Sequence, residues 1–382
     1  DLTGGTGNVG LGSGNLGTAL TTGTDNVAIG ENALDAVTTG SDNTAVGDNA
    51  GGALTTGGNN VAIGSGALLV ATTAADNTAI GTLALTANTT GTDNTAVGYA
   101  AGDAVTTGAD NTLIGDNAGG ALTTGSFNTA IGSGALITQT TAGYNTAIGY
   151  LSLTANTTGN ANVGVGESTL AANTTGSNNT ALGYNVLAAN TTGAANTAIG
   201  RNALDANTTA DNNTALGYAA LTANTTGTSN VAVGAYALDA NTTTSSNTAI
   251  GRGALSASTS DANTAVGHDA LAALTTGANN TAVGKSALDT TTTGQQNTGL
   301  GAYALDANTT GSYNTALGYA ALDANTTADN NTAVGHGSLG ANTTGTQLVA
   351  VGKSALAANT TANNNVAIGY LALAAATTAA NN

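Results

Sequence analysis

The sequence contains no cysteine, proline, methionine or tryptophan, and lysine and arginine together number only four. Without cysteine, the chain can form neither disulfides nor thiolate metal sites. The formal net charge of −17 and the scarcity of basic residues argue against nucleic acid as a partner. The sequence also lacks any apolar run of the roughly 18–20 residues that span a bilayer, so we expect no membrane span in this chain.

The residues that are present follow a strict period. The motif N-[TV]-A-[IVL]-G, with a few variations, recurs 22 times between Asn8 and Gly369, at intervals of 17 residues except for one of 18 and one of 16. Low aromatic content can indicate disorder, but 41% of residues are hydrophobic and they keep this period, which disordered chains do not. The repeat has no break, so we expect residues 1–382 to form a single continuous repeat domain.

The pattern within each unit predicts an all-β fold. Counting from the asparagine as position 1, position 2 is always Thr or Val and position 4 always Ile, Val or Leu, with Ala between them in 18 of 22 units. This alternation is typical of a strand, and we expect positions 2 and 4 to point into the core. Position 9, Leu in 19 units, is a second expected core position, whereas position 6 takes residues of every kind and is expected in solvent.

A unit of 17 residues suits one coil of a parallel β-solenoid, a β-roll, with two short strands per coil. Helix-pair repeats need more than thirty residues. The asparagine at position 1 is kept in 21 of 22 units, which predicts an amide ladder between coils stacked in register. In three units position 9 is glycine, at Gly51, Gly102 and Gly119, and position 12 is then Leu or Val, which indicates exchange of volume between the two positions.

The core motif, as in Asn213 to Gly217, resembles the "NSVAIG"-like repeats of YadA-type heads in trimeric autotransporter adhesins. It is also similar to "NTAIG…ALxxNTTG" arrays of bacterial surface proteins and phage-type tail-fibre proteins. The resemblance covers nearly the whole chain, but the unit here is longer than the usual head repeat and no stalk, coiled coil or membrane barrel is present. It implies a β-roll, often of three chains side by side, that binds or is displayed at a cell surface.

The alanines of position 3 suggest an assembly face, because under this strand assignment they point outward and yet none of the 22 residues in that row is charged. The alternative is that alanine fits a tight face of a lone solenoid. Both termini lack Lys and Pro, which also favours docking to a further copy or continuation into more sequence. The candidate assembly residues are Ala45, Ala62, Ala79, Ala96, Ala130, Ala147, Ala181, Ala198, Ala215 and Ala232.

The tripeptide NTT matches the N-glycosylation signal, so a row of glycans is one hypothesis. The alternative is turn chemistry, for which Asn and Thr are well suited. The candidate acceptors are Asn88, Asn156, Asn173, Asn190, Asn207, Asn224, Asn241, Asn308, Asn325, Asn342 and Asn359.

Nothing in the sequence predicts an enzyme, a cofactor or a metal site. The two histidines, His268 and His336, lie four units apart, which is about 19 Å along a solenoid, and the calcium-binding nonapeptide is absent. The sequence therefore predicts an extracellular or cell-surface fibre or adhesin shaft that associates with itself as a trimer or an end-to-end filament, with a host surface or carbohydrate as a further ligand. Ice-binding or glycan-coated filaments are the alternatives, although adjacent threonines do not give the alternating Thr face that ice binding needs.

Overall fold

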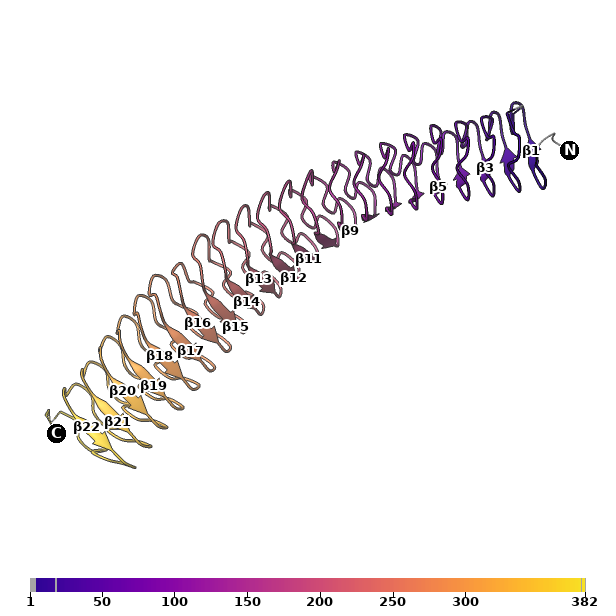
Figure 1. The fold of residues 1–382 in the computed structure, drawn as a ribbon. Coiled ribbons are helices and arrows are strands. Elements are labelled where there is room, and N and C mark those ends of the chain that lie inside the picture. Colours follow the sequence, from indigo (N-terminus) through magenta and orange to yellow (C-terminus); the bar gives the residue numbers. More distant parts are fainter. Residues whose placement is uncertain (1–4, 18, 379, 382) are drawn as a thin grey trace. The chain divides into compact units, whose positions relative to one another are not determined.

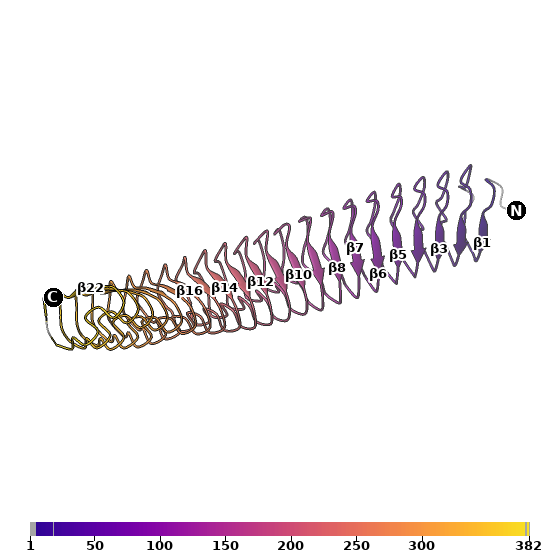
Figure 2. The same ribbon diagram turned by 90° about the horizontal axis from the view of Figure 1, so that it is seen from below.

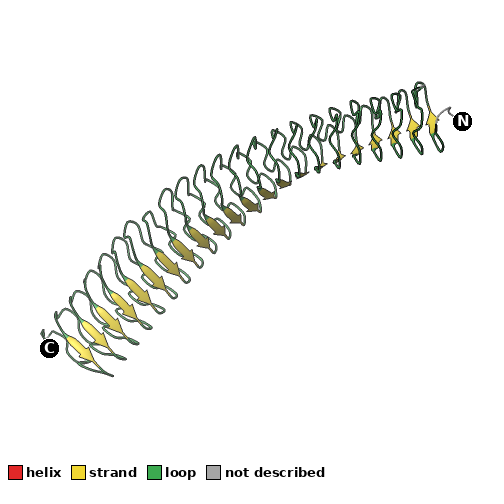
Figure 3. Cartoon of the chain, in the orientation of Figure 1, coloured by secondary structure: helices red, strands yellow, loops and turns green. Residues whose placement is uncertain are grey.

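The computed structural model of the chain describes residues 5–17, 19–378 and 380–381, and these contain only strands, turns and loops (Figure 3). The protein is a parallel β-solenoid in which each repeat forms one coil and contributes one three-residue strand made of positions 2 to 4. The predicted fold class is therefore confirmed. The chain divides into two compact units, residues 1–194 and 195–382.

The first unit holds eleven strands that follow one another in chain order (Figure 1). Each strand pairs in parallel with the next, as Thr44 does with Val61. These strands are β1 (Val9–Leu11), β2 (Val27–Ile29), β3 (Thr44–Val46), β4 (Val61–Ile63), β5 (Thr78–Ile80), β6 (Thr95–Val97), β7 (Thr112–Ile114), β8 (Thr129–Ile131), β9 (Thr146–Ile148), β10 (Val163–Val165) and β11 (Thr180–Leu182).

The second unit repeats this arrangement with eleven more strands (Figure 2). Thr214 pairs with Val231 in the same parallel register, so identical positions stack along the axis. The strands are β12 (Thr197–Ile199), β13 (Thr214–Leu216), β14 (Val231–Val233), β15 (Thr248–Ile250), β16 (Thr264–Val266), β17 (Thr281–Val283), β18 (Thr298–Leu300), β19 (Thr315–Leu317), β20 (Thr332–Val334), β21 (Val349–Val351) and β22 (Val366–Ile368).

The second strand that we expected in each coil is not formed. Its place is taken by a wall of turns, because residues of the left-handed region interrupt the extended backbone, as at Ala219 (φ 52°) and Leu221 (φ 53°). This turn wall still bonds from coil to coil, for example from the Leu221 amide to the Ala237 carbonyl at 2.9 Å. Gly217 (φ 141°) closes the strand, and a Cβ there would lie 2.6 Å from the carbonyl oxygen of Gly234, so only glycine fits.

The strands turn the opposite face toward the interior from the one that we expected. Alanine at position 3 is buried, whereas positions 2 and 4 are half-buried or exposed. Position 3 faces positions 8 and 9 of the turn wall across a narrow interior. At Gly164, for instance, an added Cβ would meet the hydroxyls of Ser152 at 2.7 Å and Thr169 at 2.9 Å. The interior has room for an alanine methyl from the strands and for leucine from the turns, so the larger β-branched side chains of the strands lie outside.

Volume in this interior is exchanged between coils without a change of backbone. Gly51 keeps the left-handed conformation of the leucines it replaces (φ 59°), and Leu54 extends its side chain to within 3.0 Å of where the missing Cβ would lie. Leu113, the only leucine at position 3, reaches the corresponding spaces at Gly102 and Gly119, at 2.5 Å and 2.8 Å. The predicted compensation is thus confirmed, and it extends to the strand.

Candidate interaction face

The outward side chains of positions 2 and 4 form one surface on each unit, which we call the strand face. Position 2 is Thr or Val and position 4 is Ile, Val or Leu in every strand from β1 to β22, so the strand face carries no charge. Leu216 is 45% exposed and Ile250 39% exposed, so position 4 presents large aliphatic side chains to solvent. Sequence reasoning placed an uncharged surface row at position 3. The structure has such a surface, but the side chains of positions 2 and 4 form it.

The threonine rows of position 2 and position 13 differ in the hydrogen bonds that their hydroxyls form. At position 13 the hydroxyl donates to the backbone carbonyl of the next coil, as from Thr38 to Thr55 at 3.0 Å and from Thr225 to Thr242 at 3.0 Å. Within the described part of the chain, the threonines of position 2 show no such bond to the protein. Their hydroxyls remain available to water or to a docked partner, beside the aliphatic row of position 4.

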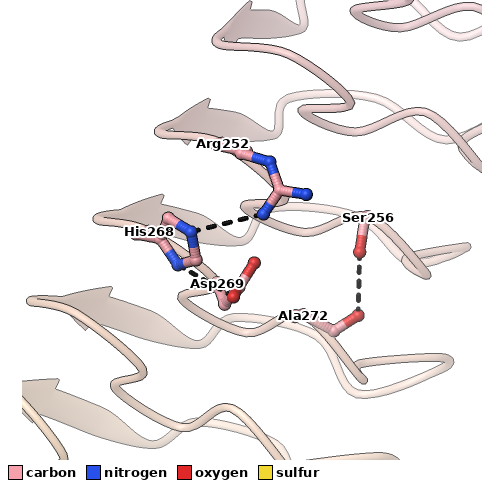
Figure 4. Close-up of polar contacts among 5 residues, drawn as sticks. All are labelled: Arg252, Ser256, His268, Asp269 and Ala272. Atoms are coloured by element: carbon pink, nitrogen blue, oxygen red, sulfur yellow. Dashed lines mark hydrogen bonds and ion pairs between the residues drawn. The ribbon is translucent and has the colours of Figure 1, made fainter.

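The strand face is bordered where the strands end by the exposed residues of position 6, which we call the position-6 edge. Figure 4 shows Arg252 and His268 on this edge, closer to the strands than Ser256 and Ala272 of position 10. The Arg252 guanidinium lies 3.3 Å from His268 Nε2, and His268 Nδ1 lies 2.8 Å from the carboxylate of Asp269. In the neighbouring coils Lys285 lies over the ring of Tyr303, 5.4 Å from its centre.

Charge on the position-6 edge has opposite signs in the two units. Every Lys, Arg and His of the sequence lies at position 6, and all of them belong to the second unit. The first unit has only acids among its charged residues at that position. The acidic members are Glu31, Asp48, Asp116 and Glu167, and the basic members are Arg201, Arg252, His268, Lys285, His336 and Lys353.

The border where the strands begin carries the residues of position 17, here called the position-17 edge. All of these residues have left-handed backbone, for example Asp42 (φ 60°) and Asn279 (φ 61°). In the first unit this edge is acidic, whereas in the second unit it has no acid. Its acids are Asp25, Asp42, Asp76, Asp93 and Asp110, all of them exposed.

The candidate glycan acceptors lie in the interior, which contradicts the glycan hypothesis. All eleven are fully buried. Asn224 illustrates the arrangement: its amide donates to Asn207 Oδ1 at 3.0 Å and to the Gly227 carbonyl at 2.9 Å, and its Oδ1 accepts from Asn241 at 2.9 Å. A glycan on such a nitrogen would need to pass through the wall of the coil. Where they occupy consecutive coils, the NTT asparagines therefore form a second amide ladder, which sequence reasoning missed because Asn-Thr-Thr is equally typical of exposed turns.

The predicted ladder at position 1 is confirmed. Asn26 Oδ1 accepts from both the backbone amide and the side-chain amide of Asn43, at 3.1 Å and 3.0 Å, and the Asn43 side chain also donates to the Gly57 carbonyl at 3.0 Å. Gln139 joins the two ladders, since its Oε1 accepts from Asn145 of the first and Asn156 of the second. Buried amides thus bond from coil to coil along two interior lines.

The candidate assembly alanines also lie inside. Each is at most 1% exposed in the single chain, so none of them forms an interface with another copy. The assignment is wrong because the strands face the other way, as the packing at Gly164 demonstrates.

A third row, the acids of position 10, lies on the turn wall. Partial burial raises the pKa of both Asp289 and Asp306. The negative charge of Asp306 raises the pKa of Asp289 further, and the negative charge of Asp323 raises the pKa of Asp306 further. Among the described residues, no group of three or more His, Cys, Asp or Glu is placed to hold a metal ion. The described part of the chain also contains no helix that could cross a membrane.

No protein-family model matches this chain, and no curated protein matches it. The resemblance to adhesin heads and tail fibres stays a prediction.

Proposed function

We propose that the protein is an extracellular structural fibre or adhesin shaft, and that copies of it associate laterally through the strand face. The observation that supports this most strongly is the complete absence of charge from two outward-facing rows, half-buried or exposed, over 22 strands. Solvent-exposed rows normally take up charged residues, as position 6 of the same coils does. A row that excludes them over such a length is typical of a surface that is covered by another chain.

The size of the strand face supports the same role. Eleven strands about 4.8 Å apart give a strip on the order of 50 Å long and 10 Å wide, or about 500 Å² per unit. The strip combines the hydroxyls of position 2 with the aliphatic row of position 4, and its size is comparable to the largest apolar patch of an ordinary monomer, about 300–600 Å², which is often functional. A repetitive shaft of this kind also presents the same turns many times, which gives avidity to weak contacts with a surface or carbohydrate.

The proposal is tested by sedimentation velocity of the whole chain over a concentration series. A chain that carries Leu182→Glu, Leu216→Glu and Ile250→Glu should sediment as a single copy where the unmodified chain forms larger species, because charge on the strand face opposes docking. The matched control carries the same three charges on exposed threonines of position 14, as Thr192→Glu, Thr226→Glu and Thr243→Glu, and should associate normally. A monomeric unmodified chain at high micromolar concentration would overturn lateral assembly.

Ice binding is a second candidate, because the strand face presents the threonines of position 2 in register beside an aliphatic row. Sequence reasoning set this function aside on the adjacent threonines of positions 13 and 14, which are not the threonines of the flat sheet. A thermal-hysteresis assay separates the two candidates. Freezing-point depression that Thr214→Glu and Thr248→Glu abolish would favour ice binding, and no hysteresis at millimolar protein would exclude it.

A further inference from the structure

From the distribution of charge along the position-6 edge, we propose that two copies dock in antiparallel orientation, with the first unit of one copy on the second unit of the other. The inference rests on the proposed lateral association and adds the orientation and register of the partner. Its occupant is a second copy of this chain. The observations that carry it are the uncharged strand face and the opposite signs of the two position-6 edges beside it.

Symmetry limits how two identical strand faces can meet. If the two-fold axis runs along the strands, the coil order of the copies is opposed and each position-6 edge meets the position-6 edge of the partner. If the axis runs along the solenoid, equivalent coils meet and each position-6 edge meets a position-17 edge. The second arrangement would bring acids such as Glu31 and Asp48 near acids such as Asp42 and Asp76 in the first units.

Only the antiparallel arrangement brings opposite charges together. Docking the two units in full reverse register places β2 on β21, β3 on β20 and β7 on β16. At position 6 these pairs are Glu31 with Lys353, which carry opposite charges, and Asp48 with His336 and Asp116 with His268, in which an imidazole N–H can donate to the carboxylate. Sheets pack about 10 Å apart, a gap that long charged side chains can bridge from the two edges. Complementary edges of this kind select orientation and suppress the wrong alignment.

The area is adequate for a stable pair. Each contact between a first unit and a second unit removes on the order of 500 Å² from either partner, and each copy carries one unit of each sign. One such contact buries on the order of 1,000 Å² in total, which reaches the area expected of a specific protein interface. The net charge of −17 is then carried largely by turns that stay outside the contact.

The first experiment reverses charge on the two edges of the whole chain. A basic-edge variant carries His268→Glu, His336→Glu and Lys353→Glu, and an acidic-edge variant carries the changes at their paired acids, Glu31→Lys, Asp48→Lys and Asp116→Lys. Each should weaken self-association at low salt by about tenfold or more. The chain with all six changes, and an equal mixture of the two variants, should associate as tightly as the unmodified chain. The two single sets shift the net charge in opposite directions, so a general charge effect cannot weaken both.

The position-17 edge supplies a matched control. A variant with Asp42→Lys, Asp76→Lys and Asp93→Lys changes the net charge as the acidic-edge variant does, but in the antiparallel pair these residues face the position-17 edge of a second unit, which has no acid. Its association should be unchanged. Stronger association of this variant, or undiminished association of both edge variants, would overturn the antiparallel arrangement.

The second experiment reads orientation directly by cross-linking and uses the absence of native cysteine. In reverse register β4 lies on β19, so Ile63 of one copy faces Leu317 of the other, and both side chains are exposed in the single chain at 37% and 41%. A mixture of Ile63→Cys and Leu317→Cys chains, treated with a bis-maleimide of about 10 Å span, should give mixed cross-links and almost no Ile63→Cys homodimer.

The outcomes separate this inference from the proposed function. Homodimers of the Ile63→Cys chain, without mixed cross-links, would show parallel association and overturn the antiparallel arrangement while lateral assembly stands. Absence of any cross-link together with monomeric sedimentation would overturn both.

Discussion

Two adjacent substitutions, Ala215→Glu and Leu216→Glu, can test which side chains of the strand point into the interior. Ordinary hydropathy predicts that the leucine change is the more damaging, whereas the structure predicts the reverse. Ala215 is fully buried in the narrow interior, and Leu216 is 45% exposed. We therefore expect Ala215→Glu to destabilise the coil strongly and Leu216→Glu to have a small effect on the folding of a single copy.

The magnitudes follow from the packing. Glu at Ala215 adds four heavy atoms to a space that admits little beyond a methyl, which costs about 1–3 kcal/mol, and it buries a carboxylate without a partner, which costs several kcal/mol more. Glu at Leu216 loses the burial of about half a leucine side chain, or about 1 kcal/mol. The difference should be several kcal/mol, and the pair Ala198→Glu and Ile199→Glu in the neighbouring coil should reproduce it.

The assay is urea unfolding followed by far-ultraviolet circular dichroism. It should be run at two protein concentrations, because a change on the strand face also weakens association and lowers apparent stability by mass action. The comparison therefore uses the dilute limit. An unfolding midpoint for Leu216→Glu at or below that of Ala215→Glu, in dilute solution, would refute the assignment of position 3 to the interior and position 4 to the surface.

Three further predictions concern the interior and the turns. Leu221→Asp should lower the free energy of unfolding by several kcal/mol because Leu221 is fully buried, whereas Tyr218→Asp, on an exposed turn, should cost about 1 kcal/mol or less; equal losses of melting temperature would contradict the assignment. Asn224→Leu should cost about 2 kcal/mol in chemical denaturation, since it removes an acceptor and two donated bonds of the buried amide ladder, and a neutral effect would show that the ladder contributes little. The raised pKa of Asp289 and Asp306 means that the folded chain binds protons more readily than the unfolded chain, so this stabilising contribution is complete below pH 3.8 and is lost as pH rises through the raised values. The unmodified chain should therefore gain more stability on acidification from pH 7 than a chain with Asp289→Asn and Asp306→Asn. Equal gains would show that these two aspartates do not contribute to the pH dependence of stability.

The sequence was sufficient for the period, the parallel register, the buried leucine of position 9 and the amide ladder of position 1. Each of these depends on repetition, because a residue kept at one position must stack on its copy in the next coil. Which face of the strand is buried could not be obtained in the same way. A three-residue strand such as Thr214–Leu216 has period-2 alternation with either face inward, and the larger apolar residues were assigned to the core.

Evidence for the true direction was nevertheless present in the exceptions. Leu113, at position 3, belongs to a coil with Gly119 and follows a coil with Gly102, so one large residue in the strand coincides with two small ones in the turn wall. Gly164 coincides with the larger Ser152 and Thr169 at position 8. Such exchange of volume occurs only between residues that share an interior. The NTT asparagines lie at position 12, which Leu54, Val105 and Leu122 occupy in other coils, and this sign of a buried position was outweighed by the preference of Asn-Thr-Thr for exposed turns.

The most direct test of the central claim, that positions 2 and 4 form an outward face that docks with another copy, is thiol labelling of Ala249→Cys and Ile250→Cys chains. Ala249 is fully buried and Ile250 is 39% exposed, and the chain has no cysteine of its own. We expect the Ala249→Cys thiol to be protected at every protein concentration. The Ile250→Cys thiol should react rapidly in dilute solution and become protected as the concentration rises through the range of self-association. Faster labelling at Ala249→Cys than at Ile250→Cys in dilute solution, or labelling of Ile250→Cys that does not change with concentration, would contradict the account.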